Sequence, residues 1–251
     1  MGADERQEHN EISPWWGEHT HRYAEACKLL RSGMRVFDIA CGNGYGTSMI
    51  AQTTQNLVTG GDISEDAVMA CRRRYAGDSH LEFHVCDGTA LTFADNTFDA
   101  VVSFETIEHT TRYREMIREF RRVLKPDGIC IISTPNIVIN SPGRKVMNPF
   151  HTQEFDYEEL SEILQGIFPN IHIYGQEYIR YHQKGFGMSV GKMLEWLLYQ
   201  RGIRKLPISI QDTIMRPFVG KGMYPETSDY RMTDEKSSLL LCKTFWAVCN
   251  K

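Results

Sequence analysis

The cysteines of this chain do not form the pairs that disulfide frameworks and zinc sites use. They are odd in number, and no two stand in a C-x-x-C arrangement. Several lie inside apolar runs, where a thiol serves as a small core side chain. No cluster of His, Cys, Asp and Glu has metal-ligand spacing either. We therefore expect no disulfides, no bound metal and a reducing cytoplasm. The cysteines are Cys27, Cys41, Cys71, Cys86, Cys130, Cys242 and Cys249.

An excess of basic charge and long apolar runs are also missing. The 251 residues include 28 Lys and Arg against 32 Asp and Glu, a net charge of −4, which disfavours a nucleic-acid partner. The first eleven residues are polar and do not resemble a signal peptide. No apolar run approaches the ~20 residues that span a bilayer. We therefore expect no nucleic-acid partner and no transmembrane segment, and 41% hydrophobic residues suffice for one core.

Short apolar runs alternate with helical patterns between residues 34 and 134. Strands separated by helices predict a parallel sheet that is covered by helices on both faces. A turn is expected at Lys125–Gly128, because Pro and Gly follow each other in turn-favoured order. The predicted strands are Arg35–Ile39, Leu57–Gly61, Leu81–Val85, Phe98–Ser103 and Gly128–Ser133, and the clearest helices are Tyr45–Gln55 and Arg112–Leu124.

The second half of the chain is less regular. It predicts a helix at Asp156–Phe168 and strands at Asn170–Ile179 and Leu239–Cys249. Between these strands we expect an insertion at about 182–236, with a helix near Ser189–Gln200. No internal repeat divides the chain. We therefore predict one domain over residues 1–251, with an N-terminal helical lid over about 1–33.

A glycine-rich turn follows the first predicted strand, in the sequence Asp38-Ile-Ala-Cys-Gly42-Asn-Gly44-Tyr-Gly46. Glycines let the backbone turn sharply and approach a ligand closely. A dinucleotide enzyme would place pyrophosphate at such a helix start, but the carboxylate of Asp38 would repel it. An acid there suits a ligand with an ammonium group, such as the methionine part of S-adenosylmethionine.

Two more acids follow the next two strands. Asp62 ends the second strand, where a carboxylate can accept hydrogen bonds from ribose hydroxyls. Asp87, followed by Gly88, comes after the third strand and can accept from an adenine amino group. A single acid of this kind is more often a cap or a solvated turn. Three at successive strand ends favour a ligand site, because open α/β sheets bind ligands at that edge.

These segments together resemble the successive motifs of class I S-adenosylmethionine-dependent methyltransferases. The resemblance covers about residues 20 to 180 and includes Phe98–Ser103, Glu108-His109 and the turn that ends at Gly128. It implies a Rossmann-like α/β fold with a seven-stranded, mostly parallel sheet whose last strand, Leu239–Cys249, is antiparallel. The helical insertion departs from the minimal family pattern.

The resemblance also implies a role for each residue of the cofactor site. Asp38, Gly42 and Gly44 would contact the methionine end of the cofactor, and Asp62 the ribose. Asp87 with Gly88 would contact the adenine, on which Ile63 would pack. Glu105 would border the cofactor at the end of the fourth strand.

Two histidines are candidates for the general base of methyl transfer. His109 ends the sequence Glu105-Thr-Ile-Glu108-His109, and His151 follows the loop after the fifth strand. The pKa of histidine lies near working pH, which suits proton removal. The alternatives are that His109 only braces Glu108 and that His151 is a hydrogen-bonded loop residue. Glu108 is the next candidate for the base.

The acceptor side resembles a narrower group of these enzymes. Ser133-Thr-Pro-Asn136 and Asn148-Pro-Phe-His151-x-x-Glu154-Phe are similar to the subset found in sugar and polysaccharide biosynthesis. The resemblance implies O-methylation of a sugar, a nucleotide sugar or a related small molecule. Methylation of another small molecule at O, N or C stays open, as does a non-catalytic cofactor-binding module. An NAD-dependent dehydrogenase is disfavoured by Asp38.

Two apolar segments allow more than one interpretation. Trp15, Trp16 and Tyr23 could cover the cofactor or only dock the first helix, and Arg22 could reach the cofactor carboxylate. The apolar face that begins at Val190 favours a core-facing or homodimer-facing helix. The basic residues from Arg201 on leave membrane-surface attachment as an alternative.

Overall fold

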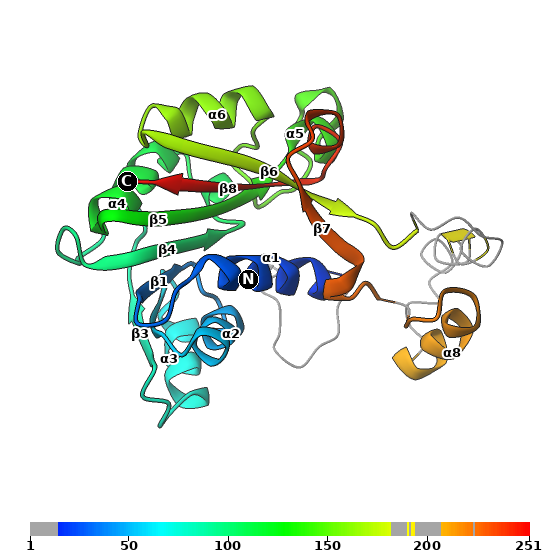
Figure 1. Cartoon of the computed structure of the whole chain (residues 1–251), viewed down its shortest axis with the longest axis horizontal. Helices are drawn as coiled ribbons and strands as arrows, with labels where there is room; N and C mark the ends of the chain where they lie inside the picture. The colour runs from blue at the N-terminus through cyan, green and yellow to red at the C-terminus, as the bar shows by residue number, and fades with distance from the viewer. Residues whose placement is uncertain (1–14, 182–189, 191, 194–206, 223) are drawn as a thin grey trace. The chain divides into compact units, whose positions relative to one another are not determined.

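The computed structural model describes the chain except residues 1–14, 182–189, 191, 194–206 and 223. The described residues form an eight-stranded sheet with the strand order β3-β2-β1-β4-β5-β8-β6-β7 (Figure 1). The strands are β1 (Arg35–Ile39), β2 (Leu57–Asp62), β3 (Leu81–Val85), β4 (Phe98–Phe104), β5 (Leu124–Pro135), β6 (Asn170–Tyr178), β7 (Tyr230–Thr233) and β8 (Thr244–Asn250).

The helices follow the strands in the alternating order that the sequence predicts. The principal ones are α1 (Trp16–Leu29), α2 (Tyr45–Thr54), α3 (Glu65–Arg74), α4 (Tyr113–Val123), α6 (Tyr157–Gln165) and α8 (Ile208–Val219). Short helices lie at η1 (Ile107–His109), α5 (Ile137–Asn140), η2 (Pro142–Arg144), η4 (Thr227–Asp229) and α9 (Lys236–Leu239). Good N-caps begin two of them: Ser64 accepts from the amide of Ala67, and Asp156 forms a capping box with Glu159.

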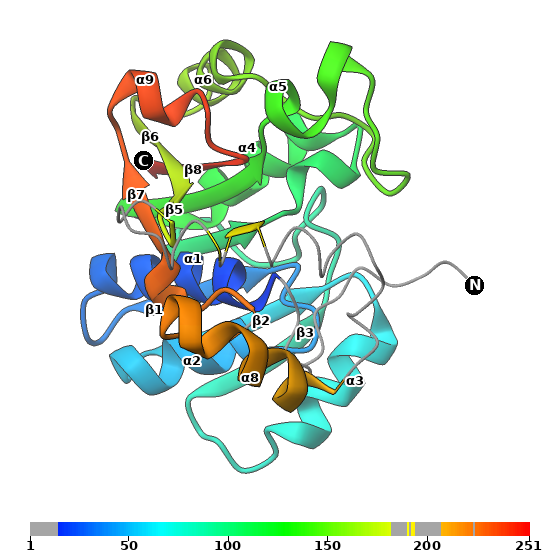
Figure 2. The same ribbon diagram turned by 90° about the vertical axis from the view of Figure 1, so that its right-hand side faces the viewer.

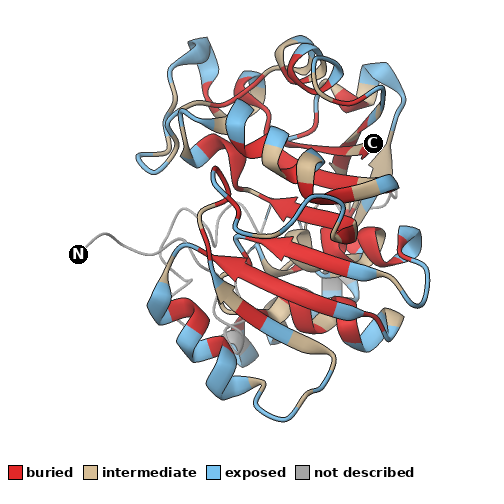
Figure 3. Ribbon diagram, turned by 90° about the vertical axis from the view of Figure 1, so that its left-hand side faces the viewer, coloured by how far each residue is buried: buried red, intermediate tan, exposed pale blue. Residues whose placement is uncertain are grey.

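Alternate residues of the strands enter two separate cores. In β4, Val101 packs in one cluster with residues of α4 and α6, while Ala100 and Val102 pack in another with residues of α1 and α2. This alternation is the period of two that a strand imposes on its side chains. Helices therefore cover both faces of the sheet, and the strands between them are mostly buried (Figure 3).

The last strand runs against its neighbours, as predicted. β8 lies between β5 and β6 and pairs antiparallel with both (Figure 2). It begins at Thr244, however, and not at Leu239. The amide of Leu239 donates to the carbonyl of Glu235, so that this residue belongs to α9 although its side chain is buried. A continuous apolar run cannot distinguish the two conformations.

The predicted turn at Lys125–Gly128 is a bulge inside β5. Phe98 pairs with Leu124 and Ala100 with Ile129, so the two strands advance unequally across this segment. Asp127 has a φ of 63°, a left-handed conformation that Asp adopts more readily than most residues. The strand therefore begins four residues before the predicted Gly128.

The count of seven strands is wrong for the described residues, because Tyr230–Thr233 forms β7. Four residues are too few for a clear alternating pattern, and they lay inside the predicted insertion. That insertion contains α8, whereas the helix predicted near Ser189–Gln200 lies largely outside the described residues. The contacts that we expect of the predicted helix, with a second copy of the chain or with a membrane surface, stay predictions. In the part of the chain that the structure covers, no helix is long and apolar enough to cross a membrane.

The chain divides into two compact units. One contains residues 22–177 and 232–251, and the other contains the described residues within 15–21 and 178–231. The second unit contains Asp229, a buried carboxylate that Lys221 contacts at 2.5 Å and Arg180 at 3.8 Å. The single domain and the lid over residues 1–33 stay predictions. The seven cysteines are all buried and free.

The packing of Tyr23 against α2 gives a first testable prediction. A Cβ atom at Gly46 would lie 2.0 Å from the ring of Tyr23, so Gly46→Ala forces a buried side chain to move. We expect a loss of about 1–3 kcal/mol in the free energy of unfolding, measured by urea denaturation. Gly166→Ala is the control, because its nearest contact would be an ordinary 3.4 Å. Equal stability of both variants would contradict this packing.

Candidate cofactor and acceptor site

The predicted cofactor residues gather at one edge of the first unit, where the parallel strands end. Asp38 is the penultimate residue of β1, Asp62 is the last of β2, and Glu105 directly follows β4. β1 pairs with both β2 and β4, so these three positions are neighbours along the edge. This is the edge at which open α/β sheets bind ligands.

Asp38 is buried and held by two hydroxyl groups. Thr47 donates to its Oδ2 at 2.6 Å, and Tyr23 donates to its Oδ1 at 3.2 Å. Burial raises the pKa of Asp38 to about 7, and the charge of Asp62 adds to the rise, while the two hydroxyls oppose it. A cationic group nearby would favour the ionised form. The carboxylate is therefore suited to respond to an ammonium ligand.

Asp62 fixes the glycine-rich turn to the end of β2. Its Oδ2 accepts from the amide of Gly42 and its Oδ1 from the amide of Ser64, both at 2.9 Å. Gly42 and Gly44 have φ values of 55° and 77°, which favour glycine. The turn thus has the left-handed backbone that glycine permits, and a Cβ atom at Gly44 would lie 2.9 Å from the ring of Tyr75.

Apolar and polar groups suited to a nucleoside stand beside Asp62. The side chain of Ile63 is 70% exposed, which is unusual for an isoleucine next to a buried strand end. Asp87 accepts from the amide and hydroxyl of Thr89 at 2.8 Å, and the backbone bond in particular lowers its pKa. Gly88 is buried against Met116 and Ile39. An apolar platform flanked by two carboxylates fits the adenosine of S-adenosylmethionine.

Glu105 is held in a strained position at the end of β4. It has a φ of 50°, and its Oε1 accepts from the hydroxyl of Ser133 at 2.7 Å. Such conformations of non-glycine residues persist only where the surroundings impose them, and they gather at functional sites. Arg22 lies 3.9 Å from the same oxygen and donates to Gln176 at 2.9 Å. Its predicted contact with the cofactor carboxylate stays a prediction.

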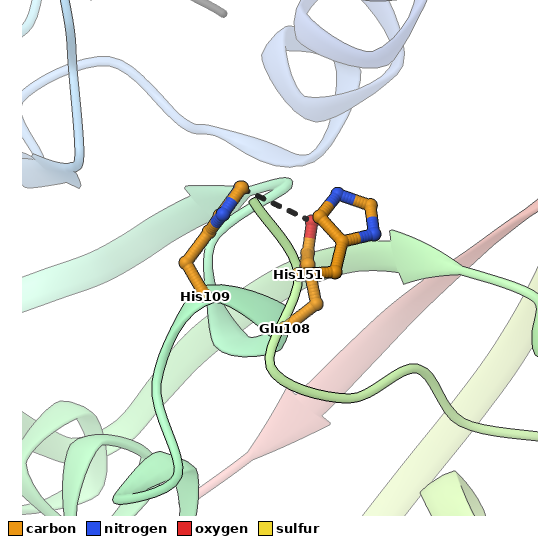
Figure 4. Close-up of side chains that lie close together, drawn as sticks. All are labelled: Glu108, His109 and His151. Carbon is orange, nitrogen blue, oxygen red and sulfur yellow. Dashed lines mark ion pairs between the residues drawn. The ribbon is translucent and has the colours of Figure 1, made fainter. Parts of the chain in front are cut away.

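The three candidate catalytic residues lie together beyond β4 and β5. Glu108 and His109 are in η1, and His151 comes from the loop after η2 (Figure 4). The rings of the two histidines are 4.9 Å apart and nearly perpendicular. Thr152 and Gln153 donate to the carbonyl of Glu108, which docks the loop onto η1.

The two histidines differ in their surroundings. The side chain of His109 is 35% exposed, and its Nδ1 lies 3.0 Å from the carbonyl oxygen of Phe150. His151 is nearly buried: its Nδ1 lies 2.7 Å from Oε1 of Glu154, and its Nε2 lies 2.9 Å from the side-chain nitrogen Nδ2 of Asn148. His151 thus has the contacts of a hydrogen-bonded loop residue, which is the alternative that the sequence left open. It does not exclude a part in the reaction.

Several contacts in the site join residues that no pattern in the sequence connects. Tyr23 is buried and donates to Asp38, a contact that joins the first helix to β1, and a cover over the cofactor by the aromatic residues near the N-terminus stays a prediction. The pairing of His109 with His151 joins residues that are 42 positions apart (151 − 109). The only sequence signal for the Glu154–His151 contact was their separation of three residues in the quoted motif.

Comparison with known proteins finds a methyltransferase domain in the part of the chain that forms this edge of the sheet. Residues 37–132 match the family described as methyltransferase domain. A probable S-adenosylmethionine-dependent methyltransferase of Mycolicibacterium smegmatis is 35% identical over 155 residues, which are 60% of this chain and 57% of that protein. Demethylmenaquinone methyltransferase of Clavibacter sepedonicus is 38% identical over 115 residues, 45% of this chain and 46% of that one. The chain thus spans about half the length of these relatives.

Solved structures agree on the fold. Phosphoethanolamine N-methyltransferase 2 of Haemonchus contortus, in complex with phosphomonomethylethanolamine and S-adenosylhomocysteine, has a TM-score of 0.60 and 20% identity. The match covers 97% of this chain and 55% of that one. The sheet and its ligand edge define an α/β methyltransferase fold. Residues 37–132 therefore match a methyltransferase domain, and a relative matched over 60% of this chain is named a probable S-adenosylmethionine-dependent methyltransferase.

The role of Asp62 can be tested by removing its carboxylate. We expect Asp62→Ala to weaken S-adenosylhomocysteine binding by about 1.5–3 kcal/mol, because hydrogen bonds to the ribose and to the turn would be lost. Asp66→Ala, an exposed acid on α3, should leave the affinity unchanged. Calorimetric titration measures both. Unchanged affinity in Asp62→Ala would remove the ribose assignment.

The raised pKa of Asp38 predicts a pH-dependent stability. The folded pKa of about 7 lies above the ordinary value near 4, so folding takes up a proton between these limits. The stabilising contribution is complete below about pH 4 and is lost as the pH rises through 7. Relative to Asp38→Asn, wild-type stability should fall by up to about 4 kcal/mol over this interval.

Urea denaturation at pH 5, 6, 7 and 8 measures this difference without cofactor. Asp127→Asn is the control, because Asp127 is exposed in the bulge of β5 and Asn tolerates its left-handed backbone. Parallel stability curves for wild type and Asp38→Asn would show that Asp38 titrates as an ordinary carboxyl group.

Proposed function

We propose that the protein transfers the methyl group of S-adenosylmethionine to an oxygen atom of a small hydroxylated acceptor. The observation that carries this proposal is the group of Glu108, His109 and His151 beside the strand end of Glu105. Two imidazoles near a cofactor edge favour an acceptor whose proton must leave during the reaction. A hydroxyl is such an acceptor, because its pKa lies far above working pH.

Methyl transfer is an in-line displacement at the sulfonium carbon. The cofactor supplies the electrophilic methyl group, and the protein orients the acceptor and takes its proton. At His109, the contact of Nδ1 with the Phe150 carbonyl requires that Nδ1 carries the hydrogen, because a carbonyl only accepts. Nε2 then carries the lone pair. His109 is therefore our first choice for the base.

His151 is better suited to hold the acceptor or to support His109. Its two ring nitrogens already contact Glu154 and Asn148, so proton removal would cost the second contact. Glu108 is buried, and burial together with the charge of Glu105 raises its pKa. It remains the alternative base.

The sugar-like acceptor rests on the short resemblance around Asn136 and His151. The named relatives and neighbours act on other acceptors, namely a demethylmenaquinone and phosphoethanolamine. Methylation at carbon or nitrogen is thus the second candidate. A panel of purified hydroxylated sugars, quinols and amines, assayed with radiolabelled S-adenosylmethionine, separates the classes. Methylation of quinols or amines alone would overturn the oxygen and sugar assignment.

Substitution of the histidines tests the base. His109→Ala should lower kcat by about 10²–10⁴-fold and leave S-adenosylhomocysteine affinity nearly unchanged, because the imidazole does not hold the cofactor. A residue that only binds the acceptor, as we expect for His151, should mainly raise KM. His84→Ala, at an exposed position of β3, is the control. If neither site histidine lowers kcat by at least about tenfold, neither is the base.

A further inference from the structure

Three side chains with metal-binding atoms converge where η1 meets the loop that carries His151. Glu108, His109 and His151 each offer one such atom, and these atoms lie within 4.8 Å of one another (Figure 4). Nε2 of His109 is 3.9 Å from Oε1 of Glu108. The group is unlike the exposed acidic clusters common on protein surfaces, since its carboxylate is fully buried.

Glu108 supplies an oxygen whose bonding is incomplete. Its Oε2 accepts from the hydroxyl of Thr134 at 2.9 Å. Its Oε1 is buried and has no hydrogen-bond donor among the described residues. A buried carboxylate oxygen without a partner costs free energy, and a bound cation would offset that cost.

The histidines are oriented in the way that metal ligands are. A metal-binding imidazole usually donates its second N–H to a carbonyl or a carboxylate, which fixes the tautomer. His109 has the Phe150 carbonyl beside Nδ1, and His151 has the Glu154 carboxylate there. Glu154 is itself held by the hydroxyl of Ser141 at 2.7 Å. In both rings Nε2 is then the nitrogen whose lone pair would face a metal ion, and His151 would give up its contact with Asn148.

We propose that Glu108, His109 and His151 bind one divalent transition-metal ion. Two imidazoles and one carboxylate favour Mn²⁺, Fe²⁺ or Zn²⁺, whereas Mg²⁺ and Ca²⁺ prefer oxygen ligands. Ligands about 2.1 Å from one ion lie roughly 3.0–3.4 Å apart, so the side chains close in by about an ångström on binding. The exposed ring of His109 has room for that movement.

This site rests on the same residues as the proposed function and changes one role: with an ion bound, Nε2 of His109 is a ligand and not the general base, and the ion activates the acceptor instead. Three protein ligands leave coordination positions open. An acceptor with a hydroxyl or carboxylate oxygen can occupy them, and the ion would lower the pKa of a bound hydroxyl. The site therefore favours acceptors with oxygen ligands, and it replaces the sequence prediction that the chain binds no metal.

Binding of Mn²⁺ tests the site independently of turnover. The chain, free of a histidine tag and treated with EDTA, is titrated with MnCl2 while the electron paramagnetic resonance signal of free Mn²⁺ is recorded. We expect one saturable site per chain. Glu108→Gln and His109→Ala should each weaken Mn²⁺ affinity by at least about tenfold. His172→Ala is the matched control, because His172 is 52% exposed and pairs with Asp234 at 3.4 Å.

The outcomes separate the metal site from the cofactor site. Circular dichroism and calorimetric binding of S-adenosylhomocysteine show whether each variant keeps its fold and its cofactor. If Glu108→Gln does not fold, His109→Ala decides, because its ring is partly exposed. Absence of saturable Mn²⁺ binding at millimolar concentration, or equal affinity in wild type and His109→Ala, would overturn the proposal.

Discussion

The edge of the sheet at which we place the ligand depends on the two hydrogen bonds that the carboxylate of Asp62 accepts. The carboxylate accepts one amide from the glycine-rich turn after β1 and one from the turn that begins α3. One side chain thereby holds two neighbouring loops in place. It also positions the start of α2 and Ile63, which directly follows Asp62. Without it, the amides of Gly42 and Ser64, both half-buried, would lose these hydrogen bonds. The geometry of the cofactor site follows from this constraint.

Charged groups at this edge of the first unit are buried to an unusual degree. Asp38, Arg22 and Glu108 are all at most 1% exposed, and each is held by hydroxyl or amide partners. Burial of charge is expensive, and natural proteins retain it mainly where the charge has a task. Here the tasks divide in space. In our proposal Asp38 and Asp62, at the ends of β1 and β2, serve the cofactor, whereas Glu108 lies beyond β4 with the two histidines.

The sequence predicted the parts of the fold that local periodicity determines. The bounds of β1 and β3 are as predicted, and the acids Asp38 and Asp62 lie at the strand ends expected of them. The parts that depend on contacts distant in the chain could not be read in this way. Tyr23 meets Asp38 across α1 and β1, and His151 reaches His109 only because Thr152 and Gln153 dock their loop onto η1. The bulge of β5 and the short strand β7 leave no periodic signal.

The central claim is that S-adenosylmethionine binds at the carboxyl ends of β1, β2 and β3. Hydrogen–deuterium exchange of the whole chain, with and without S-adenosylhomocysteine, tests it most directly. The account predicts slower exchange at residues 40–46, 62–64 and 87–89, with little change in the exposed turns of α6, and no effect of NAD at the same concentration. Protection confined to other segments, or equal protection by NAD, would contradict it.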